Sequence, residues 1–186
     1  MFNFLMKLFR NSNKETAVKA SEPQQKQKEF IIKDELPIAY RPELISELKK
    51  EHQALLRLHA EILSSAAQRN SARTASSLKE FNEELSKHLK TEFKDLYIFL
   101  EFFSMKHMPE IKKSIRDFKV EMHDISREVM GVIHKHEADQ FETDESFDAV
   151  ITDFHKLGSA LVDRITREET ELYGMYETIS QRFEIG

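Results

Sequence analysis

The chain has 186 residues, of which 40% are hydrophobic and 33% are charged, which fits one compact domain with a hydrophobic core and an additional tail. The absence of cysteine excludes disulfides, iron–sulfur clusters, thiolate zinc sites and thiol nucleophiles, and it is compatible with a reducing, cytoplasmic location. Any metal ligands must therefore be mainly oxygen and nitrogen atoms. Only four glycines and four prolines are present, which disfavours turn-rich β architectures and glycine-rich phosphate loops and makes an all-α fold the expectation.

Charge is distributed unevenly along the chain. Residues 1–41 carry eight basic and five acidic residues, so residues 42–186 hold a net charge of −8 within a total of −5. An acidic helical body is a poor nucleic-acid binder, and we expect no nucleic-acid partner.

The N-terminal region differs in composition from the rest. Residues 1–10 are mostly apolar with two interleaved basic residues. This segment is too short to cross a bilayer and lacks the cleavage site of a secretory signal. They are either an amphipathic anchor for a membrane surface or protein partner, or a tail that packs on its own domain or stays loose. Residues 11–29 have linker composition, and residues 30–40 form a short apolar arm. We therefore assign residues 1–41 to an N-terminal segment with its linker and arm, and residues 42–182 to a helical domain.

Apolar residues recur at helical spacing in four stretches. The predicted helices cover residues 42–68, 74–103, 109–134 and 144–175. Pro42 and Pro109 are favourable first-turn residues, and Asp144 is the predicted N-cap of the last helix. Short connections between long helices imply antiparallel neighbours, which predicts an up-down-up-down four-helix bundle.

Polar residues interrupt two of the apolar faces. His88 and Glu92 lie four residues apart in the second helix, as do Arg164 and Glu168 in the fourth, so each pair shares one helix face. A polar pair on a core-facing surface must be satisfied. It therefore indicates a metal site, a buried ion-pair network or catalysis.

The spacing of these residues from the turns predicts that they meet. Both helices rise at the same rate per residue, and His52 lies as far before the first turn, near residue 70, as His88 lies after it. Counting from the later turns brings Met122 of the third helix to a similar depth. We therefore expect one mid-bundle layer containing His52, His88, Glu92, Arg164 and Glu168.

Two histidines and two carboxylates facing inward suit a carboxylate-bridged transition-metal site. The order of a His, then His-x-x-x-Glu, then a third-helix position, then a final Glu before the aromatic turn at residues 168–173 resembles the hemerythrin-like HHE cation-binding domains, over about residues 42–178. Members of that family are four-helix bundles with a non-haem di-iron centre, and they bind oxygen, sense oxygen, redox state or iron, or handle nitric oxide and peroxide. The resemblance implies an iron cofactor with His52 and His88 as terminal ligands and Glu92 and Glu168 as bridging carboxylates.

Two positions depart from the family pattern. Arg164 stands where the family usually has a histidine, and it cannot ligate because it stays protonated. Met122 stands where a third-helix histidine is expected, with His123 about 100° further round the helix. Three states remain open: one metal held by the two histidines and two glutamates; two metals, with His123 recruited as a ligand; or no metal, with Arg164 pairing bidentately between Glu92 and Glu168 as a replacement cation.

The other histidines are interpreted as structural. His59 is assigned to packing, His134 and His136 to a solvated helix end, His107 to a turn, and His155 to a position off the helical seam.

Three functions follow from this reading. The first is metal binding in oxygen, nitric oxide, redox or iron sensing or handling. The second is a metal-free helical adaptor with a buried Arg–Glu network. The motifs of the second and fourth helices show some similarity to bacterial anti-sigma regulators of the sigma D type, which gives this hypothesis a specific form. The third, a di-iron oxidase or peroxidase, is the least favoured, because the ligand set is thin and no further acid or base is positioned beside it.

Overall fold

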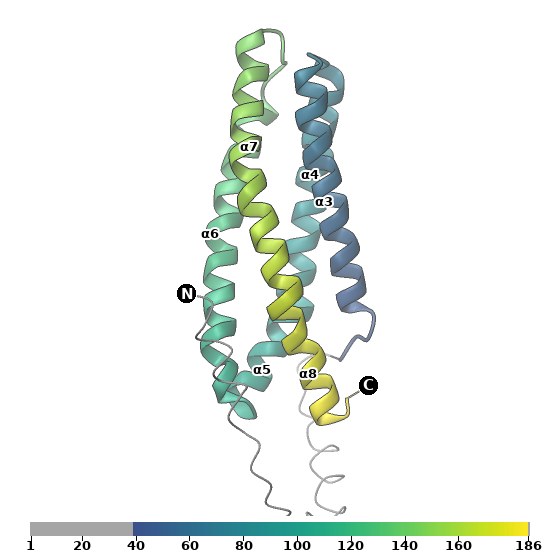
Figure 1. Ribbon diagram of the computed structural model, residues 1–186, viewed down its shortest axis with the longest axis vertical. Coiled ribbons are helices and arrows are strands. Elements are labelled where there is room, and N and C mark those ends of the chain that lie inside the picture. Colours follow the sequence, from purple (N-terminus) through teal and green to yellow (C-terminus); the bar gives the residue numbers. More distant parts are fainter. Residues whose placement is uncertain (1–38, 186) are drawn as a thin grey trace, which may run out of the picture. The chain divides into compact units, whose positions relative to one another are not determined.

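The computed structural model describes residues 39–185, which form four antiparallel helical rods (Figure 1). The elements in chain order are α3 (Leu44–Ala67), α4 (Ser71–Thr91), the π-helical segment η1 (Glu92–Tyr97), α5 (Ile98–Lys106), the 3₁₀ turn η2 (Pro109–Ile111), α6 (Lys112–Glu137), α7 (Asp144–Arg167), the π-helical segment η3 (Glu168–Leu172) and α8 (Tyr173–Phe183). The second rod runs through α4, η1 and α5, and the fourth through α7, η3 and α8. The predicted all-α, up-down-up-down bundle is confirmed. Within the described residues, no helix is long and apolar enough to cross a membrane.

Side-chain caps fix two of the helix starts. Asn70 accepts a hydrogen bond from the Arg73 N–H, so α4 begins at Ser71, three residues earlier than the sequence suggested. Thr143, not Asp144, is the N-cap of α7, because the Thr143 hydroxyl accepts from the backbone N–H of Ser146. The prediction for Asp144 was wrong by one residue, and its carboxylate lies in the first turn, where the helix dipole favours a negative charge.

The two ends of the bundle have different cores. The end near the α3–α4 turn is filled mainly by aliphatic residues with a few phenylalanines, including Leu55, Ile62, Leu78, Phe81, Val150 and Phe154. The opposite end is aromatic, and Phe99, Phe102 and Phe103 are buried there. Tyr40 stacks on Tyr176 there, with 5.1 Å between ring centroids. The predictions for the membrane or partner contact of residues 1–10 and for the linker lie outside the described residues.

The two π-helical segments change the helical register where Glu92 and Glu168 lie. In η3 the backbone N–H of Tyr173 donates to the Glu168 carbonyl five residues earlier, so the turn holds one residue more than an α-helix. Adjacent residues are buried as a result, Leu96 with Tyr97 and Leu172 with Tyr173. Met175 continues the apolar spacing of the fourth predicted helix and would face inward in an uninterrupted α-helix. It is only partly buried, because the extra residue turns Tyr176 inward instead.

His136 ties the C-terminal end of α6 to α7. The interpretation of His136 as part of a solvated helix end was wrong, since only 1% of the residue is exposed. Its Nδ1 lies 3.1 Å from an Asp139 carboxylate oxygen and its Nε2 lies 2.9 Å from one of Asp153, which also accepts from Lys135. Cations at a helix C-terminus are favoured by the helix dipole, so this cluster stabilises the last turn of α6.

We expect Asp153→Asn to lower the free energy of unfolding by about 1 kcal/mol at neutral pH, because it weakens two charge-assisted hydrogen bonds. The hydrogen bond from Lys135 lowers the pKa of Asp153, against the opposing effect of burial, and His136 adds to the lowering. A carboxylate with a depressed pKa contributes stability above its unfolded-state pKa and loses that contribution as the pH falls through its folded-state pKa. Urea unfolding over a pH series should therefore show wild type and variant converging below about pH 4. The exposed Asp163→Asn is the control, and a difference that persists unchanged in acid contradicts the assignment.

Gly158 of α7 makes room for His59 of α3. A Cβ built on Gly158 would lie 2.8 Å from the Cε1 atom of the His59 ring. The ring has little freedom to move, because its Nε2 donates to the Phe154 carbonyl at 2.7 Å. The packing role inferred for His59 is consistent with this contact.

Gly158→Ala should therefore destabilise the protein, although replacing a helical glycine by alanine ordinarily stabilises it by about 0.5–1 kcal/mol. Overpacking of this kind costs about 1–3 kcal/mol, and the double variant with His59→Ala should relieve the clash. Gly131→Ala in α6 is the matched control, because a Cβ there meets no described atom within 4 Å, and it should stabilise. Thermal or urea unfolding gives the stability of the wild type and of the three variants. Equal effects at the two glycines would contradict this account.

Candidate metal centre

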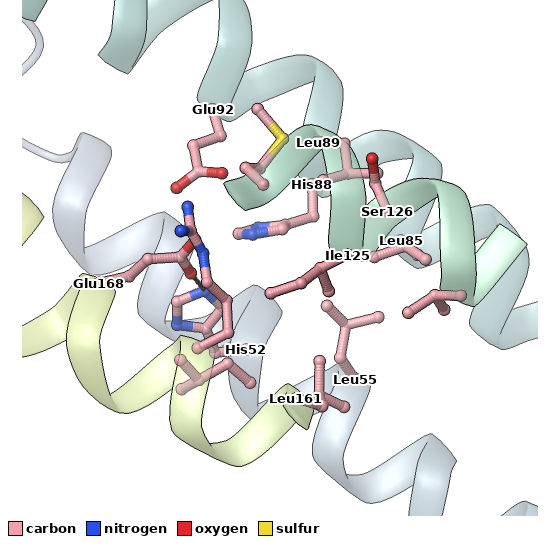
Figure 2. Close-up of a pocket in the computed structure, with 14 residues that line it drawn as sticks. His52, Leu55, Leu85, His88, Leu89, Glu92, Ile125, Ser126, Leu161 and Glu168 are labelled. Atoms are coloured by element: carbon pink, nitrogen blue, oxygen red, sulfur yellow. Dashed lines mark hydrogen bonds and ion pairs between the residues drawn. The ribbon is translucent and has the colours of Figure 1, made fainter. Parts of the chain in front are cut away.

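The five polar residues expected in one layer are all deeply buried. Their exposed fractions are 1% for His52, 4% for His88, 0% for Glu92, 5% for Arg164 and 3% for Glu168. All five line a single cavity of about 40 Å³. Figure 2 shows the two histidines and the two glutamates converging on this cavity, with leucines on its other side.

Three of these residues present ligand atoms at metal-binding separation. One ligand atom from each of His52, His88 and Glu168 can be chosen so that all lie within 4.8 Å of one another. The His52 Nε2 atom lies 3.2 Å from a Glu168 carboxylate oxygen, and the two imidazole centroids are 4.7 Å apart. A ring nitrogen and a carboxylate oxygen at this distance require a proton or a cation between them.

Two further carboxylates hold the histidine rings from outside. Glu169 lies 2.9 Å from His52 Nδ1, and Glu51 lies 3.2 Å from His88 Nδ1. The hydrogen bond with His88 lowers the pKa of Glu51, although burial opposes the shift. Sequence reasoning missed both residues. The signal that could have found them is an acidic residue next to a candidate ligand, Glu51 before His52 and Glu169 after Glu168.

Glu92 is an orphaned buried carboxylate. Neither of its side-chain oxygens has a hydrogen-bond partner within residues 39–185. Burial, followed by the nearby charge of Glu168, raises the pKa of Glu92 well above its ordinary value. A buried carboxyl group without partners is costly, and it is satisfied only by a bound proton or by a ligand that the cavity admits.

Arg164 is the buried cation of the layer, and each of its three guanidinium nitrogens donates at least one hydrogen bond. Its Nε donates to Glu168, its Nη2 to the Tyr97 hydroxyl at 3.0 Å, and its Nη1 to both the Phe118 carbonyl and Glu121 at 3.1 Å. The guanidinium also lies over the Phe118 ring. The bidentate pairing between Glu92 and Glu168, which belongs to the third of the three open states, was wrong, because within residues 39–185 Arg164 bonds only Glu168 of the two. Its other donors reach Tyr97 and α6.

Glu168 is held ionised by its neighbours. Burial raises its pKa, but the interaction with His52 and the charge of Arg164 outweigh that effect, so the pKa of Glu168 lies below its ordinary value. The two glutamates of the layer therefore differ. Glu168 is a paired anion, whereas Glu92 has a raised pKa, and neither of its oxygens accepts a hydrogen bond from a donor among the described residues.

The third helix contributes no nitrogen ligand. Met122 lines the cavity, whereas His123 is exposed and is not among the described residues that line it. The next residue on an α-helix is rotated by about 100°, and here that rotation turns His123 to solvent. The structure therefore does not bring His123 into the layer.

The second and fourth rods repeat one motif. Residues 88–97 and 164–173 share a polar residue, then Glu four residues later, then Leu-Tyr four residues after that. Arg164 thus occupies the position that His88 holds in the other copy. Both copies place their Glu at the start of a π-helical segment and both bury their Tyr, which bonds Arg164 in one copy and His52 in the other. A Leu-Tyr pair at the end of each motif is a sequence feature that the two π-helical regions share.

One comparison with known proteins identifies the family of this chain. The family model of the hemerythrin HHE cation-binding domain matches residues 43–176. The chain belongs to this family. Its buried His/Glu group therefore lies in a domain whose family is described by cation binding. No curated protein gives a significant match, and neither does a solved structure.

The donor set of this hemerythrin-family chain fits one metal ion better than two. Two imidazoles, the paired Glu168 and the orphaned Glu92 are ligand types suited to iron, and they share one cavity. Arg164 takes the place of a further histidine, and its fixed positive charge would disfavour a second cation beside it.

Arg164→Ala should lower the free energy of unfolding of the metal-free protein by about 3–5 kcal/mol, because it strands buried partners that Arg164 now satisfies. Arg167→Ala is the matched control. Arg167 also contacts Glu121 and the Phe118 ring, but its side chain is 43% exposed, so its loss should cost less than about 1 kcal/mol. Urea unfolding in the presence of a chelator compares the two. Similar losses would show that the buried network is not what stabilises the layer.

Proposed function

We propose that this chain is a hemerythrin-like protein that binds one non-haem metal ion, iron, held by His52, His88, Glu168 and Glu92. The orphaned carboxylate of Glu92 carries the proposal, because it faces the same cavity as a ready group of two histidines and a glutamate. A cation bound there would have three stabilising effects on the layer. It would partner Glu92, separate His52 from Glu168, and balance the buried negative charge.

Arg164 supports a count of one ion. Its guanidinium is fixed by hydrogen bonds to Glu168, Tyr97 and the third helix, so its charge cannot withdraw when a metal enters. We infer that it takes over the charge-balancing role that a second metal ion has in a dinuclear site.

The cavity supports a role with a very small ligand. Its volume of about 40 Å³ is close to the space one or two water molecules occupy, and leucines line much of it. Bound iron would supply a redox-active Lewis acid there. The chain's own part is to exclude bulk water with Leu55, Leu85 and Leu161 and to hold the ligands in place. We therefore propose sensing or handling of dioxygen, nitric oxide, redox state or iron.

Metal analysis after anaerobic reconstitution with Fe²⁺ tests the proposal. We expect about one iron per chain, and loss of at least tenfold in affinity for His88→Ala and Glu92→Gln, because each removes a ligand. His155→Ala is the control, since that histidine is exposed on α7. Iron near background in the wild type, or equal iron in all variants, would disprove the proposal. Each protein is checked for folding by circular dichroism.

A second candidate function is a metal-free adaptor. The hydrogen bonds that Arg164 makes to two other helices favour it, since such a network can fix helix register without any metal. In that case Arg164→His should create metal binding that the wild type lacks. If the wild type already binds one iron, the adaptor reading fails.

A further inference from the structure

The two histidines of the layer use the same ring nitrogen for the same purpose. In both, Nδ1 is engaged by a carboxylate on a neighbouring rod, Glu169 for His52 and Glu51 for His88. A carboxylate accepts hydrogen bonds and does not donate them when ionised. Each Nδ1 must therefore carry a proton, which leaves the lone pair to Nε2. The Nε2 atom of His52 lies 3.2 Å from the Tyr173 hydroxyl, which can donate to it, and 3.2 Å from a Glu168 oxygen, where a bound cation would separate the two groups.

Helix geometry explains how these carboxylates reach their histidines. Consecutive residues of a helix point about 100° apart. When His52 points into the layer, the preceding Glu51 points sideways toward α4 and meets His88. When Glu168 points into the layer, Glu169 points sideways toward α3 and meets His52. In the first and fourth rods, one rotational setting thus places both an inward-facing group and the carboxylate that supports a histidine of a neighbouring rod.

We propose that Glu51 and Glu169 are positioning residues that fix the proton of His88 and His52 on Nδ1, so that both Nε2 atoms are presented to the metal ion. This inference rests on the proposed function for its consequence, metal affinity, but its premise concerns the metal-free protein. Carboxylates behind metal-bound histidines fix the tautomer and raise the basicity of the ligand.

The support is confined to one side of the layer. The residue after Glu92 is Phe93, which is 46% exposed, and the corresponding side of the fourth rod holds Arg164 instead of a histidine. The supported nitrogens therefore belong to the His52 and His88 half of the layer. These two histidines are among the residues that would hold the proposed ion.

Nitrogen-15 NMR of the metal-free protein tests the premise. At about pH 8, above the ordinary pKa of histidine, the wild type should show the proton of His88 on Nδ1. Glu51→Leu should shift His88 toward the Nε2-protonated form, which free histidine favours, and Glu51→Gln should give a partial shift. Glu169→Leu should do the same to His52. Glu84→Gln and Glu171→Gln are the controls: Glu84 pairs with Lys87 as Glu51 does, and Glu171 is an exposed residue of η3.

Chelator competition with Fe²⁺ tests the consequence. Glu51→Leu and Glu169→Leu should each weaken Fe²⁺ binding about 10–100-fold, with the controls unchanged. An unchanged His88 tautomer in Glu51→Leu overturns the inference, as does wild-type affinity in both leucine variants. Tautomer shifts without Fe²⁺ binding by any of the proteins would uphold the positioning role and disprove only the proposed metal function.

Discussion

The charge balance of one buried layer governs this structure. Two glutamates and two histidines are buried at mid-bundle, and a low-dielectric interior tolerates such a group only if its charges and hydrogen bonds are compensated. Arg164 supplies part of that compensation through Glu168, and it joins the fourth rod to the second and third. Glu92 is left without a partner among the described residues. The layer is therefore complete around Arg164 and incomplete around Glu92, and this asymmetry underlies the functional proposal.

Much of the fold could be predicted from the sequence because it depends on a regular repeat. Apolar residues at helical spacing predicted the four helices, and the short connections between them predicted their antiparallel order. Counting from the turns placed His52 level with His88. The burial of both histidines, Glu92, Arg164 and Glu168 follows from the same rule. Such counting succeeds because every helix rises at the same rate, whatever its side chains.

The remaining details depend on interactions that a repeat does not encode. A π turn depends on which carbonyl each N–H selects, so the inward position moved from Met175 to Tyr176 without warning from periodicity. The burial of His136 depends on Asp139 and on Asp153 of another helix. Arg164 likewise bonds the Tyr97 hydroxyl and the Phe118 carbonyl. Both acceptors are uncharged, so a pattern of charges in the sequence could not predict that Arg164 would bond them instead of Glu92.

The π turns also divide the bundle into two blocks with different helical phase. Each inserted residue rotates everything beyond it by about 100°, so α5 and α8 present faces to the aromatic end that an uninterrupted α4 or α7 would have turned away. Tyr40 and Phe99 both pack on Tyr176 and so hold that rotated phase. Packing at the aromatic end thus fixes the rotation of α8 about its axis, and with it the position of the side chains that α8 adds to the layer. Slippage of α8 back to α-helical phase would carry Tyr173 away from His52, although neither residue lies in the aromatic end itself.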